Sequence, residues 1–214
     1  MKTANFRFVA CLALLVGMAP WSFLSAADPV PDYGPVGPAT EIVRPGAVVW
    51  MDLLTGDVNK AASFYGEVFG WSFRFSPGRD YAYGTLNGVP VASIAAYEAD
   101  MEDADGLWIP SISVTDVDAA MAAARSNGGS LVGPAEDLPG RGRYGLIEDS
   151  TGAAAMLLRA SSGDPRRSKS TGQWLWAELW TDDVEASKAF YGKVVGYGTV
   201  AVKDTEGQTY MVMG

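Results

Sequence analysis

The chain has 214 residues, of which 48% are hydrophobic and 19% charged, and its formal net charge at pH 7 is −9. An acidic chain repels phosphate backbones and anionic headgroups, which argues against nucleic acids and membrane surfaces as partners. The sequence has one cysteine and no histidine. Intramolecular disulfides and the usual Ser/His or Cys/His nucleophilic pairs are therefore excluded.

Residues 1–27 have the pattern of a secretory signal peptide. A start with two basic residues is followed by an apolar run from Phe8 to Leu24 and by small residues at 25–27. We expect cleavage before Asp28 and a secreted or periplasmic protein. An uncleaved anchor is the alternative, although a glycine and a proline interrupt the run, which is short for a spanning helix. Residues 28–46 are rich in Pro and Gly without periodicity, which predicts an extended linker.

One stretch of the mature chain occurs twice. Residues 48–71 and 174–197 align without a gap at a separation of 126 positions. The matched pairs include Trp50/Trp176, Asp57/Asp183, Phe64/Phe190, Tyr65/Tyr191 and Gly70/Gly196. A more diverged copy spans 107–129, with Asp116 at the corresponding position. Such self-similarity indicates that one supersecondary unit is reused.

Each copy predicts a strand followed by a helix. A run rich in apolar residues ends at a threonine, and the aspartate two residues later suits a helix N-cap. Apolar residues then recur at helical spacing up to Gly70, which suits a C-terminal cap. Further strands are predicted at 71–75, 81–86 and 89–97 in the first module and at 130–132, 143–148 and up to Arg159 in the second.

These patterns resemble the vicinal-oxygen-chelate superfamily, which includes glyoxalase I, bleomycin-resistance proteins and extradiol dioxygenases. The resemblance is carried by FYGEVFGW after the first capping aspartate, by DVDAAMAAARSNGG and by GRGRYGLIEDSTGAAAMLL. It implies an α+β fold, in which two βαβββ modules (47–160) form a curved eight-stranded sheet around a cavity, with the helices outside.

The remainder predicts a partial second domain. Residues 161–172 are interpreted as a basic, flexible linker, and 173–214 as the start of a third module without its partner. An unpaired half-domain leaves strand edges and apolar surface open. We therefore expect either a truncated two-domain protein or a unit completed by another chain, as in a homodimer.

The resemblance also implies where a metal would bind. The family's metalloenzymes place His and Glu ligands on the first and last strands of both modules, which correspond here to Trp50, Ala92, Ile109 and Met156. These side chains are poor ligands for transition metals. We expect no metal and no other cofactor.

Two carboxylates follow ligand-equivalent tryptophans. Asp52 and Glu178 each lie two residues after such a tryptophan and should face the cavity with it. Asp52 is a candidate general base, an unusual metal ligand or a ligand-binding group. Alternatively, backbone amides or an arginine such as Arg143 or Arg159 neutralise it.

Aromatic residues on the predicted strands suit a small-molecule pocket. The candidate ligand-binding residues are Trp50, Asp52, Tyr83, Trp108, Arg143, Tyr144 and Met156. Core packing is the alternative for the aromatic residues. The favoured hypothesis is an exported, metal-free protein that binds a small organic molecule. A lyase or dioxygenase-type enzyme that uses Asp52 is the second hypothesis, and an interaction module that dimerises through 173–214 is the third.

Overall fold

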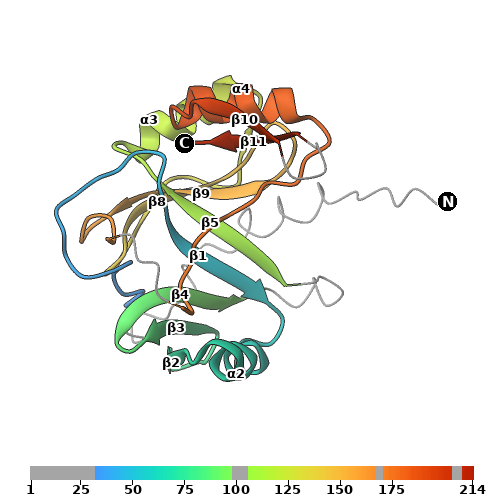
Figure 1. The fold of residues 1–214 in the computed structure, drawn as a ribbon. Coiled ribbons are helices and arrows are strands. Elements are labelled where there is room, and N and C mark those ends of the chain that lie inside the picture. Colours follow the sequence, from blue (N-terminus) through green and yellow to red (C-terminus); the bar gives the residue numbers. More distant parts are fainter. Residues whose placement is uncertain (1–31, 98–105, 167–170, 204–208) are drawn as a thin grey trace.

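The computed structural model of the chain describes residues 32–97, 106–166, 171–203 and 209–214. A curled mixed sheet has the strand order β2-β3-β4-β1-β5-β9-β8-β6, with β7 paired to β8 off this path (Figure 1). Its strands are β1 (Val48–Thr55), β2 (Ser72–Phe75), β3 (Tyr81–Leu86), β4 (Val89–Ala96), β5 (Leu107–Ser113), β6 (Ser130–Leu131), β7 (Glu136–Leu138), β8 (Gly142–Glu148) and β9 (Ala154–Ala160). The predicted curved α+β sheet is confirmed.

The three helices of the described residues begin as their sequences predict. They are α2 (Val58–Phe69), α3 (Val117–Ser126) and α4 (Val184–Val194). Asp57, Asp116 and Asp183 each accept a hydrogen bond from the backbone amide three residues later. Gly70 ends α2 in the left-handed conformation at φ 72°, and its N–H bonds to the carbonyl of Gly66. None of these helices is long and apolar enough to cross a membrane.

The central strands join the two modules. β1 pairs with β4 in parallel and with β5 in antiparallel orientation. The helices α2 and α3 cover one face of the sheet, where they pack against separate apolar clusters. We call the opposite face the inner face. β7 is a short additional strand that pairs with β8, in a segment where the sequence predicted no strand.

Two segments predicted as linkers are packed against the sheet. Within 32–46, the side chain of Val36 is 1% exposed and joins a cluster with Trp50 and Tyr83. Asp164, in the second predicted linker, is fully buried, and its carboxylate accepts hydrogen bonds from the Ser113 hydroxyl and the Arg44 amide. The linker interpretation is therefore wrong for the described parts of both segments, because their backbone and side-chain groups find partners inside the domain.

The repeated stretch near the C-terminus folds differently from its first copy. Residues 173–181 contain no strand, although a strand was predicted there. A strand needs a neighbour for its backbone groups, and no described strand pairs with this segment. α4 does form and packs on α3, while β10 (Thr199–Lys203) and β11 (Thr209–Met213) make a separate two-stranded sheet. Figure 1 shows α3, α4 and this sheet together at one end of the molecule and α2 at the other.

Candidate functional site

A carboxylate with several hydrogen-bond donors lies in the middle of the inner face. Asp52 pairs in register with Ser93 on β4, and Trp50 pairs with Ser111 on β5. Paired residues, and residues two apart on a strand, point to one face. The Asp52 carboxylate accepts hydrogen bonds from the Trp50 indole at 3.1 Å, from the Ser93 hydroxyl and from the Ser111 hydroxyl at 3.5 Å. Because its side chain is 13% exposed, this group remains within reach of a small molecule.

The positive partner of Asp52 is Arg141. Its guanidinium lies 3.7 Å from an Asp52 oxygen and stacks over the Trp50 ring, 4.3 Å from the ring centroid. Arg141 is 2% exposed. It comes from the turn before β8, between Gly140 at φ 77° and Gly142 at φ 130°, conformations that favour glycine. The sequence pointed to Arg143 or Arg159 instead; the Gly-Arg-Gly pattern is the signal that marks Arg141.

Tyrosine side chains surround this centre. The Tyr83 ring stacks on Trp50, 5.7 Å between centroids, and Tyr144 packs against the same cluster. Burial raises the pKa of Tyr83 to about 12, although the Arg141 charge opposes the shift. Burial also raises the pKa values of Tyr81 and Tyr144, and the Glu136 carboxylate raises that of Tyr144 further. These hydroxyls therefore act as neutral donors and acceptors near pH 7.

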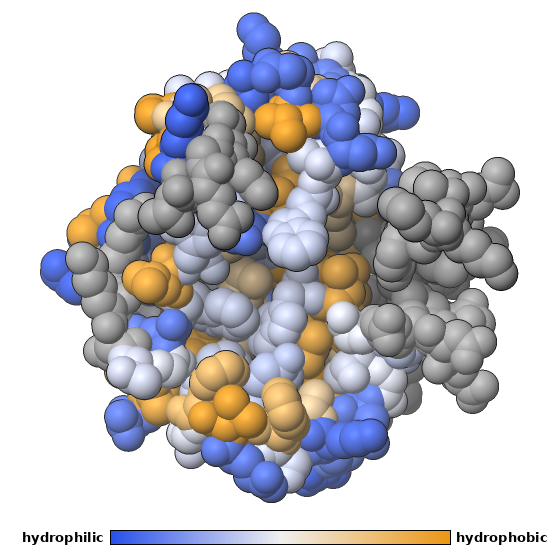
Figure 2. Space-filling model, turned by 45° about the vertical axis from the view of Figure 1, so that its right-hand side comes forward, coloured by the Kyte–Doolittle hydropathy of each residue, from blue (hydrophilic) through white to orange (hydrophobic). Residues whose placement is uncertain are grey.

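Residues 32–37, which we call the strap, cross the inner face beside this centre. The Tyr81 hydroxyl donates to the carbonyl of Tyr33 at 3.0 Å, and the Tyr83 hydroxyl donates to that of Pro35 at 2.5 Å. A hollow of about 120 Å³ remains at the strap's start, lined by Asp32, Arg74, Phe75, Ser76, Pro77, Tyr81 and Tyr83. Figure 2 shows one face of the molecule, with strongly hydrophilic residues mainly around its rim and paler or hydrophobic residues across its middle.

The other predicted site residues are dispersed. Met156 is half-buried on the inner face, in register with Ser111. Trp108 points to the helix face, where its indole donates to the Tyr65 hydroxyl at 3.0 Å. Arg143 lies at the surface, 2.8 Å from Asp118.

Glu178 was predicted to face the cavity together with a ligand-equivalent tryptophan. It is instead exposed in the segment 173–181, where the Trp180 indole donates to its carboxylate at 3.4 Å. Because this segment forms no strand, the alternation that would direct Glu178 toward an inner face does not apply.

The side chains at the centre do not suit a metal ion. Trp50, Ile109 and Met156 lie on the inner face, where the family pattern would place ligands. The fourth position was assigned to Ala92, but Ala92 packs with Trp71 on the helix face. Indole, alkyl and thioether groups are inadequate donors for a divalent ion. Within the described ranges, no group of three His, Cys, Asp or Glu side chains could hold one.

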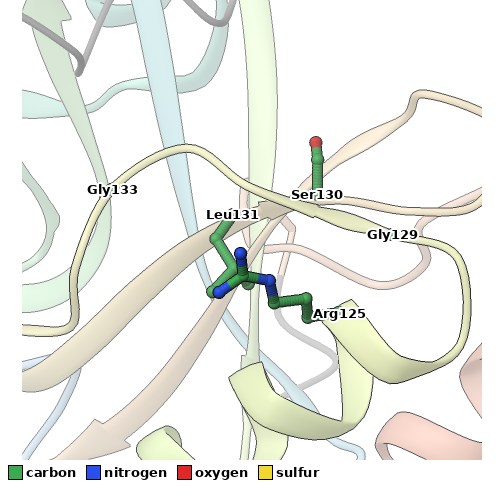
Figure 3. A pocket seen from close by; sticks show the side chains of 5 residues that line it. All are labelled: Arg125, Gly129, Ser130, Leu131 and Gly133. Carbon is green, nitrogen blue, oxygen red and sulfur yellow. The ribbon is translucent and has the colours of Figure 1, made fainter.

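A second hollow lies outside this centre. It has a volume of about 480 Å³ and is lined by Arg125, Gly129, Ser130, Leu131 and Gly133. Figure 3 shows Arg125 extending from the end of α3 toward Leu131. The Ser130 hydroxyl is engaged by Glu148 at 2.6 Å. This open hollow presents one cation and few other polar side chains, so we do not regard it as the candidate site.

Comparison with known proteins identifies the family. Residues 47–157 match the model of the Glyoxalase/Bleomycin resistance protein/Dioxygenase superfamily. The chain belongs to this superfamily.

Among curated relatives, the chain is 36% identical over 176 residues to the Mycobacterium tuberculosis protein named "Putative glyoxylase CFP32". That alignment covers 79% of this chain and 67% of the relative. The anthracycline biosynthesis protein DnrV of Streptomyces peucetius is 29% identical over 168 residues, which cover 71% of this chain and 61% of DnrV.

Solved structures show the same fold. Homoprotocatechuate 2,3-dioxygenase from Brevibacterium fuscum, in its complex with 3,4-dihydroxyphenylacetate, superimposes with a TM-score of 0.54 at 19% identity, covering 86% of this chain and 60% of that one. The catechol dioxygenase BphC gives a TM-score of 0.51 at 13% identity, covering 78% and 59%. The chain thus spans a little over half the length of these dioxygenases.

Proposed function

We propose that the protein binds a small organic molecule on the inner face of its sheet, without a metal, at the centre formed by Asp52 and Arg141. The observation that carries this proposal is the Asp52 carboxylate, which is anchored by Trp50, Ser93 and Ser111 yet remains 13% exposed. A few fixed polar groups among aromatic side chains are typical of small-molecule sites.

The donor set supports a metal-free mode of binding. Where metalloenzymes of the family would need imidazole or carboxylate ligands, this chain has Trp50, Ile109 and Met156. Among the described residues, Asp52 is the carboxylate at the centre, and Arg141 already lies beside it. A divalent cation there would be repelled by the guanidinium at short range.

Elemental analysis of the untagged protein, combined with native mass spectrometry, tests this proposal. We expect no transition metal in stoichiometric amount and an organic molecule retained by the full chain. One metal per chain would contradict the proposal. As a control, the same measurements on Asp52→Asn should show a reduced occupancy of the organic molecule.

A lyase or dioxygenase-type activity that uses Asp52 as a base is the second candidate. It is favoured by the unequal bonding of the carboxylate. One oxygen accepts from Trp50 and Ser93, whereas the other has a single long contact of 3.5 Å with Ser111. The second oxygen is therefore available to take a proton from a bound molecule. Turnover that survives in Asp52→Asn would reject this role.

Export is a separate proposal that rests on the sequence. Residues 1–27 lie outside the described residues, and their pattern remains that of a secretory signal peptide. N-terminal sequencing of protein recovered from a bacterial periplasm or culture medium should begin at Asp28. Recovery of the intact chain in the membrane fraction would favour the uncleaved anchor.

We also propose self-association through the C-terminal unit. Leu175, Trp176 and Trp180 are 76%, 62% and 89% exposed, which is unusual for large apolar side chains. A second copy presents the same surface and can cover it symmetrically. Sedimentation velocity should show a dimer whose population falls in Trp176→Ser/Trp180→Ser. A concentration-independent monomer would contradict the proposal.

A further inference from the structure

The strap is held as a bound peptide would be held. Three successive carbonyl oxygens, those of Tyr33, Gly34 and Pro35, accept hydrogen bonds from side chains of the folded domain. Arg141 alone donates to two of them, at 2.8 Å to Gly34 and 2.7 Å to Tyr33. All of these hydrogen bonds are accepted by main-chain oxygens. They therefore require a series of successive carbonyl groups, whichever side chains the strap carries.

Side-chain packing flanks these bonds. The Tyr33 ring meets Tyr81 edge-on at 5.2 Å between centroids. Val36 fills a site beside Trp50 and Tyr83, where it is 1% exposed. A Cβ atom at Gly34 would lie 2.7 Å from the Tyr83 ring, which shows how closely the backbone approaches the groove.

The strap is anchored separately from the segment that follows it. Downstream of the strap, Asp164 accepts the Arg44 amide and its own amide donates to the carbonyl of Ile42 at 2.7 Å. The strap does not contribute a strand to the sheet. The strap itself has a backbone hydrogen bond to the rest of the domain, from the Tyr33 amide to the carbonyl of Pro139 at 3.0 Å, and Gly37 lies against Pro165. Release of residues 32–36 would leave the hydrogen bonds around Asp164 intact.

We infer that the groove on the inner face takes an extended peptide or peptide-like molecule, and that the strap occupies this groove as an internal competitor. The inference rests on the proposed function, since it names the ligand class for the same face. An apolar ligand that displaced the strap would remove the two carbonyl acceptors of Arg141 and those of the Tyr81 and Tyr83 hydroxyls, and buried donors that lose their acceptors are costly. A ligand with successive carbonyl oxygens replaces those bonds one for one.

The test uses the full chain and a labelled probe with the strap's own sequence, acetyl-Asp-Tyr-Gly-Pro-Val-Gly-amide. Gly34→Ala should expel the strap, because residue 34 has φ +69° and no room for a Cβ atom. Gly70→Ala is the matched control, since it carries the same backbone strain at φ +72° with no atom within 4 Å. Hydrogen exchange at the amides of residues 33, 34 and 36 reports strap release, and fluorescence anisotropy reports probe binding.

We expect Gly34→Ala to bind the probe at least about tenfold more tightly than the wild type or Gly70→Ala, because the tethered competitor is removed. Adding Arg141→Met should abolish that gain. A released strap without probe binding would overturn the inference, and so would unchanged exchange at the amides of residues 33, 34 and 36. If Gly34→Ala fails to fold, Tyr83→Phe removes only the donor to the Pro35 carbonyl, and unchanged exchange at the neighbouring amides of Gly34 and Val36 would also overturn the inference.

The two proposals fail separately. An organic molecule retained on the wild-type protein, with no probe bound by Gly34→Ala, would leave the proposed function standing and reject the peptide-like class. The opposite result is also possible: the wild-type protein retains no organic molecule, and Asp52→Asn binds the probe as well as the protein with Asp52 does. That result would support the peptide groove and reject Asp52 as the binding centre.

Discussion

Arg141 and Arg143 are two residues apart and have opposite environments. Arg141 is buried and donates to two strap carbonyls and to the Tyr81 hydroxyl at 2.9 Å, with Asp52 nearby. Arg143 forms surface ion pairs with Asp118 and Asp137. Burial and the number of partners, rather than charge alone, therefore decide which arginine supports the fold.

We expect Arg141→Met to lower the free energy of unfolding by about 3–5 kcal/mol, because Asp52 and the strap carbonyls would lose a buried partner. Arg143→Met should change it little, since water replaces a surface ion pair at small cost. Urea denaturation followed by tryptophan fluorescence measures both. Equal losses in the two variants would show that Arg141 does not hold the inner face together.

Stability should fall at alkaline pH because of the buried tyrosines. Burial raises the pKa of Tyr83 to about 12, above the unfolded value of about 10. The contribution of Tyr83 is fully present below pH 10 and is lost as the pH rises toward 12, since the unfolded state gives up its proton first. Denaturation midpoints of wild type and Tyr83→Phe should therefore converge over that range. A difference between the two midpoints that stays constant from pH 10 to 12 would contradict a raised pKa of Tyr83.

The site residues on strands were predictable from the sequence, whereas the contribution of Arg141, which lies in a turn, was not. Alternation along β1 places Trp50 and Asp52 on the same face, as the sequence predicted. Trp108 was predicted for the pocket but faces the helices, because it is one position out of phase with Ile109. Arg141 lies in a turn without periodicity, where the flanking glycines mark the turn but do not fix the direction of the arginine side chain.

The repeat-related helices α2 and α4 occupy different environments. Phe64 on α2 is 57% exposed, whereas its repeat equivalent Phe190 on α4 is 1% exposed and packs against the cluster around Met121 and Ala124. The difference arises because α4 docks on α3, while α2 packs on its own module's strands. Local sequence therefore predicts that a helix forms, but not what it contacts.

Phe190→Ala should destabilise the protein by about 3–5 kcal/mol, since it leaves a cavity between α3 and α4. Phe64→Ala is the matched control and should cost much less, because the side chain is already largely in water. Thermal unfolding of the two variants compares them. A similar loss in both would mean that α4 is not docked as described.

The elements with strong periodicity were predictable, and the aperiodic ones were not. The strands of both modules and the starts of all three described helices follow from alternation, helical spacing and the capping aspartates. The sequence predicted linkers at the strap and at residues 161–166, because the residues that form hydrogen bonds with these segments are distant in sequence. The strand predicted at 174–181 fails because strand formation depends on a neighbouring edge, which sequence alone does not reveal.

At the scale of the whole molecule, the sheet is one continuous structure shared by two modules. β1 lies between β4 of its own module and β5 of the next, so the inner face forms only when both modules are present. The family model matches residues 47–157, which include nearly all of both modules. The C-terminal unit is attached through α4 and by Trp174, whose indole donates to the carbonyl of Val91 at 2.8 Å.

The strap also constrains the order in which the chain can fold. Its hydrogen bonds to Arg141 span 107 and 108 residues, and the bond from Arg44 to Asp164 spans 120. Contacts of such long sequence separation close late, because the intervening loop must be ordered first. A ribosome that has made residue 46 has therefore produced the strap but not the surface that receives it. We expect the N-terminal segment to stay open to processing enzymes until β8 has been synthesised.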